Sequence, residues 1–460
     1  MRGVKIMKVV KFGGSSLSDA KQLEKVANII KKDPARRIVV VSAPGRRFED
    51  DIKVTDLLIA LHGNKVTGLS TDDAMEQILE RYELIINDLD ISSDLLKDFK
   101  SILNRYLENI ENKDRLLDAL KSCGEDFNAQ LLSEYLNKTG VPAKYMPPKE
   151  AGIRVTDEPS NAQLLPESYD ALAKLDYTDH VLVIPGFFGV SETDQIVTFP
   201  RGGSDITGAI VARGVDAELY ENFTDVSFIY SAHPGLIESP HAIKEITYRE
   251  MRELSYAGFS VFHDEAIEPL YKNKTPIMIR NTNDPEVEGT KIVADREFIP
   301  EMPVIGISCD EGFTSITLRK YLMNRQIGFT RQLLQILEDH EINIEHIPSG
   351  IDNLSVIIRS NQFEGNSKLE DILKDIEEKL EPEDMYVEED LVLLVIVGEG
   401  MKEHIGIATK TTSALSDNSV NISMINQGAS EISMMFAIGI EDEEKALKAI
   451  YNNYFQHVSV

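Results

Sequence analysis

Two glycine turns contain the residues whose types and spacing could do chemistry. The first is Lys11-Phe12-Gly13-Gly14-Ser15-Ser16, which follows a β-branched run. Adjacent glycines let bare backbone approach a ligand, unpaired N–H groups at a following helix start favour an anion, and Lys11 adds a point charge. The same pattern also fits a plain strand-to-helix turn. Taken alone, the motif therefore leaves a phosphate cradle and a structural turn both open.

The second turn is Arg201-Gly202-Gly203-Ser204-Asp205, which precedes the helical spacing of Ile206, Ala209 and Ile210. An arginine can hold a carboxylate through two parallel hydrogen bonds. Asp205 lies near the helix start, where a carboxylate often serves only as a cap. An arginine and a carboxylate on one glycine turn favour a ligand-binding role over a purely structural one.

Two further acidic segments have competing interpretations. Glu125 follows Cys123-Gly124 inside residues 71–138, whose apolar spacing predicts mostly helix. It is either a solvated carboxylate at a helix start or a ligand group. His263 stands beside Asp264 and Glu265, and this run fits a charged helix N-terminus better than a metal site. We predict no metal held by the protein's own side chains.

The elements that position these residues follow an α/β pattern. Residues 5–12 and 37–42 are β-branched runs of the kind buried in a parallel sheet, and a helix with Asp19 as N-cap and Gln22 in its first turn separates them. Thr55 opens a second helix, and residues 181–190 form another buried strand. Strand, glycine turn, helix and strand in this order predict a mostly parallel central sheet between helices.

Composition excludes several classes of function. The net charge of -29 over 460 residues provides no basic surface for nucleic acid or for an anionic membrane. No apolar run reaches the ~18 residues of a membrane span, and the start lacks a signal-peptide core. Two cysteines give no disulfide framework, so we expect a cytoplasmic protein. No Gly-Lys dipeptide occurs, which excludes a Walker A loop.

The period changes after Pro300, where an internal repeat begins. Eight residues of the first copy recur 78 positions later, from Gly328 and Leu337 to Gly406 and Leu415. Each copy is predicted as helix, strand, turn, strand and helix, with a loop at 387–390 between the copies. The copies resemble paired ferredoxin-like α+β modules. Neither contains a nucleophile with a neighbouring base, so the repeat indicates binding.

Together these motifs resemble those of aspartate kinases, which belong to the amino-acid kinase family and have tandem ACT domains. The motifs that carry the resemblance occur in that family's order: Lys11–Ser16, Val40–Ala43, Gly124-Glu125, Gly186-Phe187, Arg201–Asp205, Phe223-Thr224-Asp225 and Gly289-Thr290. The resemblance implies the amino-acid-kinase fold over residues 1–298, with a nucleotide-binding lobe from about 215, and ACT modules at 299–384 and 385–460. It also implies transfer of a phosphoryl group from ATP with Mg²⁺ to L-aspartate. That reaction is the first step towards lysine, threonine and methionine.

The resemblance implies roles for individual residues. Lys11 and Asp205 would be catalytic. The residues implied for aspartate are Thr55, Glu125, Phe187, Arg201 and Ser204, and those implied for ATP are Lys11, Gly13, Gly14, Ser15, Thr224, Asp225 and Tyr230. Two departures remove cations that many relatives carry, because Gly235 and Ser260 stand at those positions. Arg46, Arg47, Lys53 and Arg213 are the candidate substitutes.

ACT modules in this family bind amino acids, so the resemblance implies feedback inhibition by lysine and/or threonine. The implied effector residues are Met323, Phe329, Asn343, Ile344 and Glu345, with a counterpart turn at Gln427, Gly428 and Glu431. Relatives of this type pair their ACT modules across a homodimer or a dimer of dimers. Two alternatives remain: a catalytically weakened amino-acid-binding regulator of the same fold, and a kinase for another small carboxylate.

Overall fold

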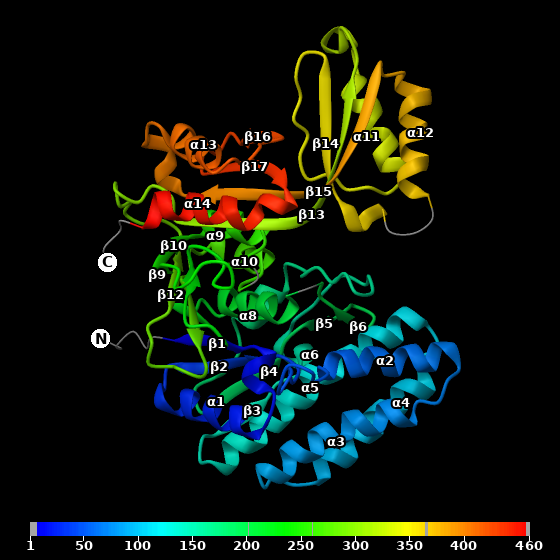
Figure 1. Ribbon diagram of the computed structural model, residues 1–460. Coiled ribbons are helices and arrows are strands. Elements are labelled where there is room, and N and C mark those ends of the chain that lie inside the picture. Colours follow the sequence, from blue (N-terminus) through cyan, green and yellow to red (C-terminus); the bar gives the residue numbers. More distant parts are fainter. Residues whose placement is uncertain (1–6, 201, 260, 364–366, 457–460) are drawn as a thin grey trace. The chain divides into compact units, whose positions relative to one another are not determined.

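The computed structural model describes residues 7–200, 202–259, 261–363 and 367–456, and these fall into two compact units (Figure 1). The first unit contains residues 1–229, 242–255 and 260–296, and the second contains residues 230–241, 256–259 and 297–460. No helix among the described residues is long and apolar enough to cross a membrane.

The first unit is built on an eight-stranded sheet with the order β10-β12-β11-β7-β1-β2-β4-β3. All neighbouring pairs are parallel except β11 and β12. The strands are β1 (Lys8–Phe12), β2 (Arg36–Val41), β3 (Ala143–Tyr145), β4 (Val181–Pro185), β7 (Leu219–Thr224), β10 (Glu245–Thr247), β11 (Ile277–Asn281) and β12 (Thr290–Val293). Short hairpin strands are β5 (Phe188–Val190), β6 (Ile196–Thr198), β8 (Ile229–Tyr230) and β9 (Ala242–Ile243). The mostly parallel sheet predicted from the sequence is confirmed.

Helices connect and cover these strands. They are α1 (Ala20–Lys32), α2 (Val54–Thr67), α3 (Asp72–Asp88), α4 (Asp94–Asn109), α5 (Lys113–Lys138), α6 (Pro148–Ala151), α7 (Ser168–Leu172), α8 (Gly203–Gly214), α9 (Tyr248–Tyr256) and α10 (Ile267–Tyr271). Short 3-10 helices are η1 (Gly14–Leu17) and η2 (Asp264–Ala266). Asp19 caps α1 as predicted, because its side chain accepts a hydrogen bond from the Gln22 backbone N–H at 2.9 Å.

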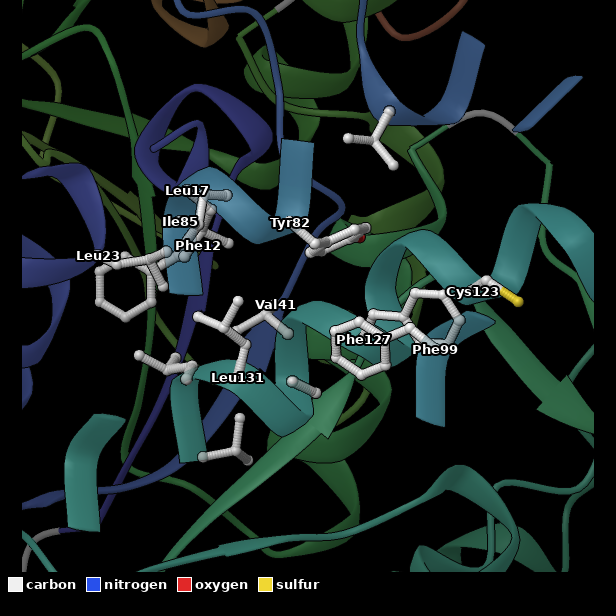
Figure 2. Packing of buried hydrophobic residues seen from close by; sticks show 14 of the residues in the cluster. Phe12, Leu17, Leu23, Val41, Tyr82, Ile85, Phe99, Cys123, Phe127 and Leu131 are labelled. Atoms are coloured by element: carbon white, nitrogen blue, oxygen red, sulfur yellow. The ribbon is translucent and has the colours of Figure 1, made fainter. Parts of the chain in front are cut away.

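One apolar core joins the sheet to the helical segment between β2 and β3. Phe12 and Val41 contribute from the central strands, and Tyr82, Phe99 and Phe127 contribute from α3, α4 and α5 (Figure 2). The Phe99 and Phe127 rings stack with centroids 4.1 Å apart, and Tyr82 meets both edge-on. This core therefore holds α5 against β1 and β2, and the candidate site lies at the carboxyl ends of these strands.

The second unit contains a five-stranded antiparallel sheet with the order β14-β13-β15-β17-β16. Its strands are β13 (Gly306–Arg319), β14 (Asn353–Arg359), β15 (Asp384–Val397), β16 (Met424–Gln427) and β17 (Ser433–Gly439). Its longer helices are α11 (Phe329–Asp339), α12 (Lys368–Leu380), α13 (Ile407–Asp417) and α14 (Glu443–Phe455), and its 3-10 helices are η3 (Met323–Arg325), η4 (Ser360–Phe363), η5 (Glu399–Glu403) and η6 (Ile440–Asp442). Gly328 and Gly406 have φ of 82° and 94° before α11 and α13, so the repeat places a left-handed residue at matching helix starts.

Two local predictions were wrong. The loop predicted at 387–390 is part of β15, which pairs with β13 on both sides of a register shift, and Asp390 lies at this irregularity with φ 54°. The first of the two strands predicted for the first copy is reduced to isolated bridges at His346 and Ser349. Of the two alternatives for Glu125, the helix start is excluded, because Glu125 lies in the middle of the 26-residue helix α5. In each case tertiary pairing or packing decided the local structure over composition.

Candidate active site

A cavity of about 720 Å³ lies where the central parallel strands end. Part of its wall is formed by residues that come just after these strands in the chain. They are Gly14 and Ser15 after β1, Ser42 to Pro44 after β2, Phe187 after β4 and Asp225 after β7. Ligands of open α/β sheets bind beyond the carboxyl ends of the strands, and this cavity has that position. Other residues that line it are Lys11, Gly45, Arg46, Arg47, Phe48, Glu49, Lys53, Thr55, Glu125, Gly202, Gly203, Ser204 and Asp205.

Lys11 and Asp205 bring the two glycine turns together. The Lys11 Nζ lies 2.6 Å from the Asp205 Oδ1, and both side chains are largely buried. Asn222, from the neighbouring strand β7, donates its Nδ2 to the same Asp205 oxygen at 2.8 Å, and its own Oδ1 lies 3.5 Å from the Lys11 Nζ. The Lys11 ammonium group is therefore held at the cavity wall, and the Asp205 carboxylate balances part of its charge.

In the first glycine turn, the missing Cβ of Gly14 lets the backbone approach the loop after β2, and neither glycine has a left-handed φ. A Cβ on Gly14 would lie 3.0 Å from the Ala43 carbonyl oxygen, so the β1 and β2 loops pack backbone against backbone. Gly13 donates its N–H to the Phe223 carbonyl at 3.0 Å. The Gly13 N–H is therefore hydrogen-bonded within the fold. Gly14 and Ser15 line the cavity, whereas Gly13 does not.

The second turn does need left-handed backbone. Gly202 has φ 75°, and a Cβ there would lie 2.4 Å from the His263 ring, which packs directly on the turn. Phe187 has φ 74°, an uncommon value for a residue with a side chain, and donates its N–H to the Thr207 Oγ1. Ser204 lines the cavity, and its contact with aspartate stays a prediction, whereas Arg201 lies outside the described residues.

Glu125 is a buried carboxyl group facing this cavity from α5. Its Oε2 has no hydrogen-bond partner among the described residues. Burial raises the pKa of Glu125 to about 8, although a hydrogen bond from the Ala43 backbone and the positive charge of Lys121 oppose the rise. Because its Oε2 has no hydrogen-bond partner among the described residues, the ionised form of this buried group is a suitable partner for a ligand's ammonium group.

Gly124 explains how α5 comes so close to Ala43, in the loop after β2. A Cβ at Gly124 would lie 2.7 Å from the Ala43 Cβ, so the glycine lets the helix contact the loop that follows β2. One turn before Glu125, Lys121 places its Nζ 5.3 Å from the Phe187 ring centroid. Burial lowers the pKa of Lys121.

The residues predicted for the nucleotide are only partly brought together. Asp225 lines the cavity, and the Thr224 Oγ1 donates to the Asp225 Oδ1 at 3.2 Å. Tyr230 belongs to the second compact unit. Its contact with a nucleotide therefore stays a prediction.

Three of the four candidate substitute cations line the cavity, namely Arg46, Arg47 and Lys53. Thr55 joins them from the first turn of α2. Arg213 does not, since it lies at the opposite end of α8 from Asp205 and stacks on Tyr169 with 3.9 Å between guanidinium carbon and ring centroid. Arg213 is therefore wrong as a substitute.

Sequence reasoning missed Asn222 and Lys121. A signal existed for both. Asn222 is a polar residue in the buried part of strand β7, and Lys121 stands four residues before Glu125, on the same face of one helix. The signal at Asn222 does not point to its partners Lys11 and Asp205, because both lie far away in the sequence.

The five residues predicted for an effector lie in one module of the second unit. Met323 and Phe329 are buried in its core, and Ile344 packs against that core. Asn343 exchanges hydrogen bonds with the Gln362 side chain. Glu345 accepts from the Tyr256 hydroxyl and lies 3.4 Å from the Arg359 Nε, so its carboxylate has partners within the fold.

Comparisons with known proteins agree with this architecture. The amino acid kinase family matches residues 7–281, and the ACT domain matches residues 394–454. Aspartokinase 3 of Bacillus subtilis is 49% identical over 99% of this chain and 100% of its own length. The crystal structure of Clostridium acetobutylicum aspartate kinase is 38% identical, with a TM-score of 0.86, over 97% of this chain and 100% of that chain.

This chain belongs to the aspartokinases of the amino-acid kinase family. The aspartokinase fold therefore includes the mostly parallel sheet and a C-terminal ACT domain, and the chain is an aspartate kinase by family. A third relative, the lysine-sensitive aspartokinase 3 of Escherichia coli, is 26% identical over 97% of this chain and 99% of its own length.

Proposed function

We propose that this aspartokinase transfers the γ-phosphoryl group of ATP to the side-chain carboxylate of L-aspartate, in the first step towards lysine, threonine and methionine. A carboxylate oxygen forms a bond to the γ-phosphorus, the bond from that phosphorus to the β-phosphate oxygen breaks, and 4-phospho-L-aspartate and ADP result. The observation that carries the proposal is one cavity lined both by the Lys11–Asp205 pair and by Glu125, whose Oε2 has no hydrogen-bond partner among the described residues.

Both substrates are anions, so positioning and charge neutralisation should supply most of the catalysis. Lys11 would stabilise the charge on the phosphoryl group during transfer, and Gly14 and Ser15 would donate backbone hydrogen bonds to phosphate. Asp205 and Asn222 hold the ammonium group of Lys11 in place. Mg²⁺ would arrive with ATP, held mainly by phosphate and water.

The aspartate would lie between the second glycine turn and α5. Glu125 would accept its ammonium group, while Thr55, Phe187 and Ser204 line the same cavity. Arg201 would hold a carboxylate. Asp225, with Thr224 and Tyr230, would contact the nucleotide.

Activity is tested by an ATP- and Mg²⁺-dependent hydroxamate assay with L-aspartate and, separately, L-glutamate. The proposal expects product with aspartate and little with glutamate. A preference for glutamate would identify a kinase for another carboxylate. Activity on neither substrate would favour an amino-acid-binding regulator instead.

Inhibition by lysine and/or threonine through modules at 299–384 and 385–460 is the regulatory part of the proposal. It is supported by the doubled module and by the name of the lysine-sensitive relative. Such inhibition requires a higher affinity for the less active of two states. These modules would also pair two copies of the chain, giving a homodimer or a dimer of dimers.

We expect millimolar lysine to slow the reaction and Glu345→Gln to raise the inhibiting concentration about tenfold, because an ammonium–carboxylate hydrogen bond is lost. Glu370→Gln, at an exposed position of α12 in the same module, is the matched control and should leave lysine inhibition unchanged. Initial rates with lysine, threonine and both together measure this. Wild-type rates that neither amino acid lowers would contradict it.

A further inference from the structure

We propose that Arg81 is a positioning residue for catalysis, which acts through Gly45 and Asp51 to hold residues 44–53 against the Gly13-Gly14 turn. The proposal rests on the function proposed above, because the loop and the turn are two walls of the same cavity. Arg81 itself does not line the cavity, and nothing in its sequence context assigns it a role there.

Arg81 lies on the buried face of α3, between Ile78 and Ile85, and only 4% of it is exposed. Its guanidinium group reaches three separate points. The Nη1 donates to the Asp51 Oδ2 at 2.7 Å, and the Nη2 donates to the carbonyl oxygens of Ser18, at 3.3 Å, and Gly45. One planar group therefore ties α3 to the segment after the first glycine turn and to the loop after β2.

The contact at Gly45 lies next to the first glycine turn. Gly45 donates its N–H to the Gly14 carbonyl at 2.9 Å, and a Cβ on Gly45 would lie 2.6 Å from the Gly14 carbonyl carbon. Since the Gly45 carbonyl accepts from Arg81, the same peptide segment is held from both sides. A shift of Gly45 would move the backbone that is proposed to receive phosphate.

The contact at Asp51 fixes the opposite part of the loop. Asp51 accepts hydrogen bonds from the Arg47 backbone N–H and Nε, each at 2.9 Å, and from its Nη2 at 2.8 Å. These hydrogen bonds hold the pKa of Asp51 below its usual range, and the nearby charge of Arg81 acts in the same direction. The carboxylate thus stays charged and keeps Arg47 folded onto the loop.

The loop held in this way lines the cavity with three cations, Arg46, Arg47 and Lys53. Two anionic substrates must bind against that wall and the facing Gly14. Because a displacement of about 1 Å in a positioning element can cost 10²-fold in rate, a fixed loop matters to catalysis beyond its effect on stability.

A buried arginine can also serve stability alone, and Arg36 provides the matched control. Arg36 is 7% exposed, forms a two-point ion pair with Glu221 at 2.6 and 3.0 Å and donates to the Ile29 carbonyl. It makes as many hydrogen bonds as Arg81 within the same unit but does not contact the cavity loop. Arg81→Lys and Arg36→Lys both keep the charge and remove the planar fork.

The experiment compares steady-state kinetics of the full chain for Arg81→Lys, Asp51→Asn, their double variant and Arg36→Lys. Arg81→Lys should lower kcat/KM about tenfold or more, with KM rising for both ATP and aspartate. Asp51→Asn should do the same, and the double variant should be little worse than either, since both act on one loop. Arg36→Lys should lower the thermal midpoint and keep the kinetic constants.

Hydrogen exchange gives a readout independent of activity. Amides of residues 43–53 should exchange faster in Arg81→Lys and in Asp51→Asn than in Arg36→Lys. If the wild type showed no kinase activity, the proposed function would fail while this measurement still tested the loop. The proposal would be overturned if Asp51→Asn had the KM values and the amide exchange rates of the wild type. If Arg81→Lys does not fold, the result for Asp51→Asn alone decides the question.

Discussion

The Lys11 side and the Glu125 side of the cavity differ in how their charge is balanced. Lys11 lies 2.6 Å from Asp205, which also accepts from Asn222, so this side is complete before any ligand binds. Glu125 has an oxygen without a partner among the described residues and a pKa raised to about 8 by burial. The comparison shows that the charge of Lys11 is paired within the fold, whereas Glu125 has an oxygen with no partner in the described part of the chain, which, under the proposed function, would accept the ammonium group of aspartate.

Replacing Lys11 should have the largest effect. Lys11→Met keeps most of the length of the side chain but removes the charge, and we expect kcat to fall about 100-fold or more because a group that stabilises transition-state charge is lost. Lys8→Met is the matched control on the same strand, since Lys8 pairs with Asp33 at 2.8 Å and does not line the cavity. Steady-state kinetics with both substrates measure the difference. Equal losses in the two variants would refute the role of Lys11.

Replacing Glu125 should act on aspartate affinity. Glu125→Gln should raise the aspartate KM about tenfold or more, because the ammonium group loses a charged acceptor. Below its pKa of about 8, Glu125 in the empty cavity must release a proton before it can pair with that ammonium group. The wild-type KM should therefore fall from about pH 6 to about pH 8 and then level off. In Glu125→Gln it should be high and nearly independent of pH.

Glu125 should also affect the free energy of unfolding, and this is the smallest of the effects expected here. The pKa of Glu125 is higher in the folded chain than in the unfolded chain, so unfolding releases a proton at pH values between its ordinary pKa of 4.5 and about 8. Stability is therefore lost as pH rises through that window. Glu125→Gln, which does not titrate, should gain on the order of a few kcal/mol over the wild type above about pH 8 and little near pH 5. Urea unfolding without substrates measures this, with the exposed Glu134→Gln in the same helix as control.

The sequence predicted the sheet and the two glycine turns because these features are local. Each turn directly follows or precedes a strongly patterned element, and both must lie at the same sheet edge. The environment of Glu125 could not be predicted in this way. The sequence left a helix start open as an alternative for Glu125, whereas Gly124 lets the middle of α5 approach Ala43 closely.

The supporting side chains were missed for a related reason. The contacts of Asn222 with Lys11 and Asp205, and of Arg81 with Asp51, join residues that stand 17 to 211 positions apart in the sequence. A charged residue on the apolar face of α3 was a visible signal at Arg81, but composition does not reveal which carbonyl groups it reaches. The loop predicted at 387–390 was wrong because pairing with β13 overrides its acidic composition.

The most direct test of this account measures kcat and the aspartate KM for Lys11→Met and Glu125→Gln side by side. The account predicts a division: Lys11→Met lowers mainly kcat, and Glu125→Gln raises mainly the aspartate KM, with its pH dependence removed. If both substitutions changed the same constant to the same extent, or if the KM of Glu125→Gln kept the wild-type pH profile, the two sides of the cavity would not have the separate roles assigned to them.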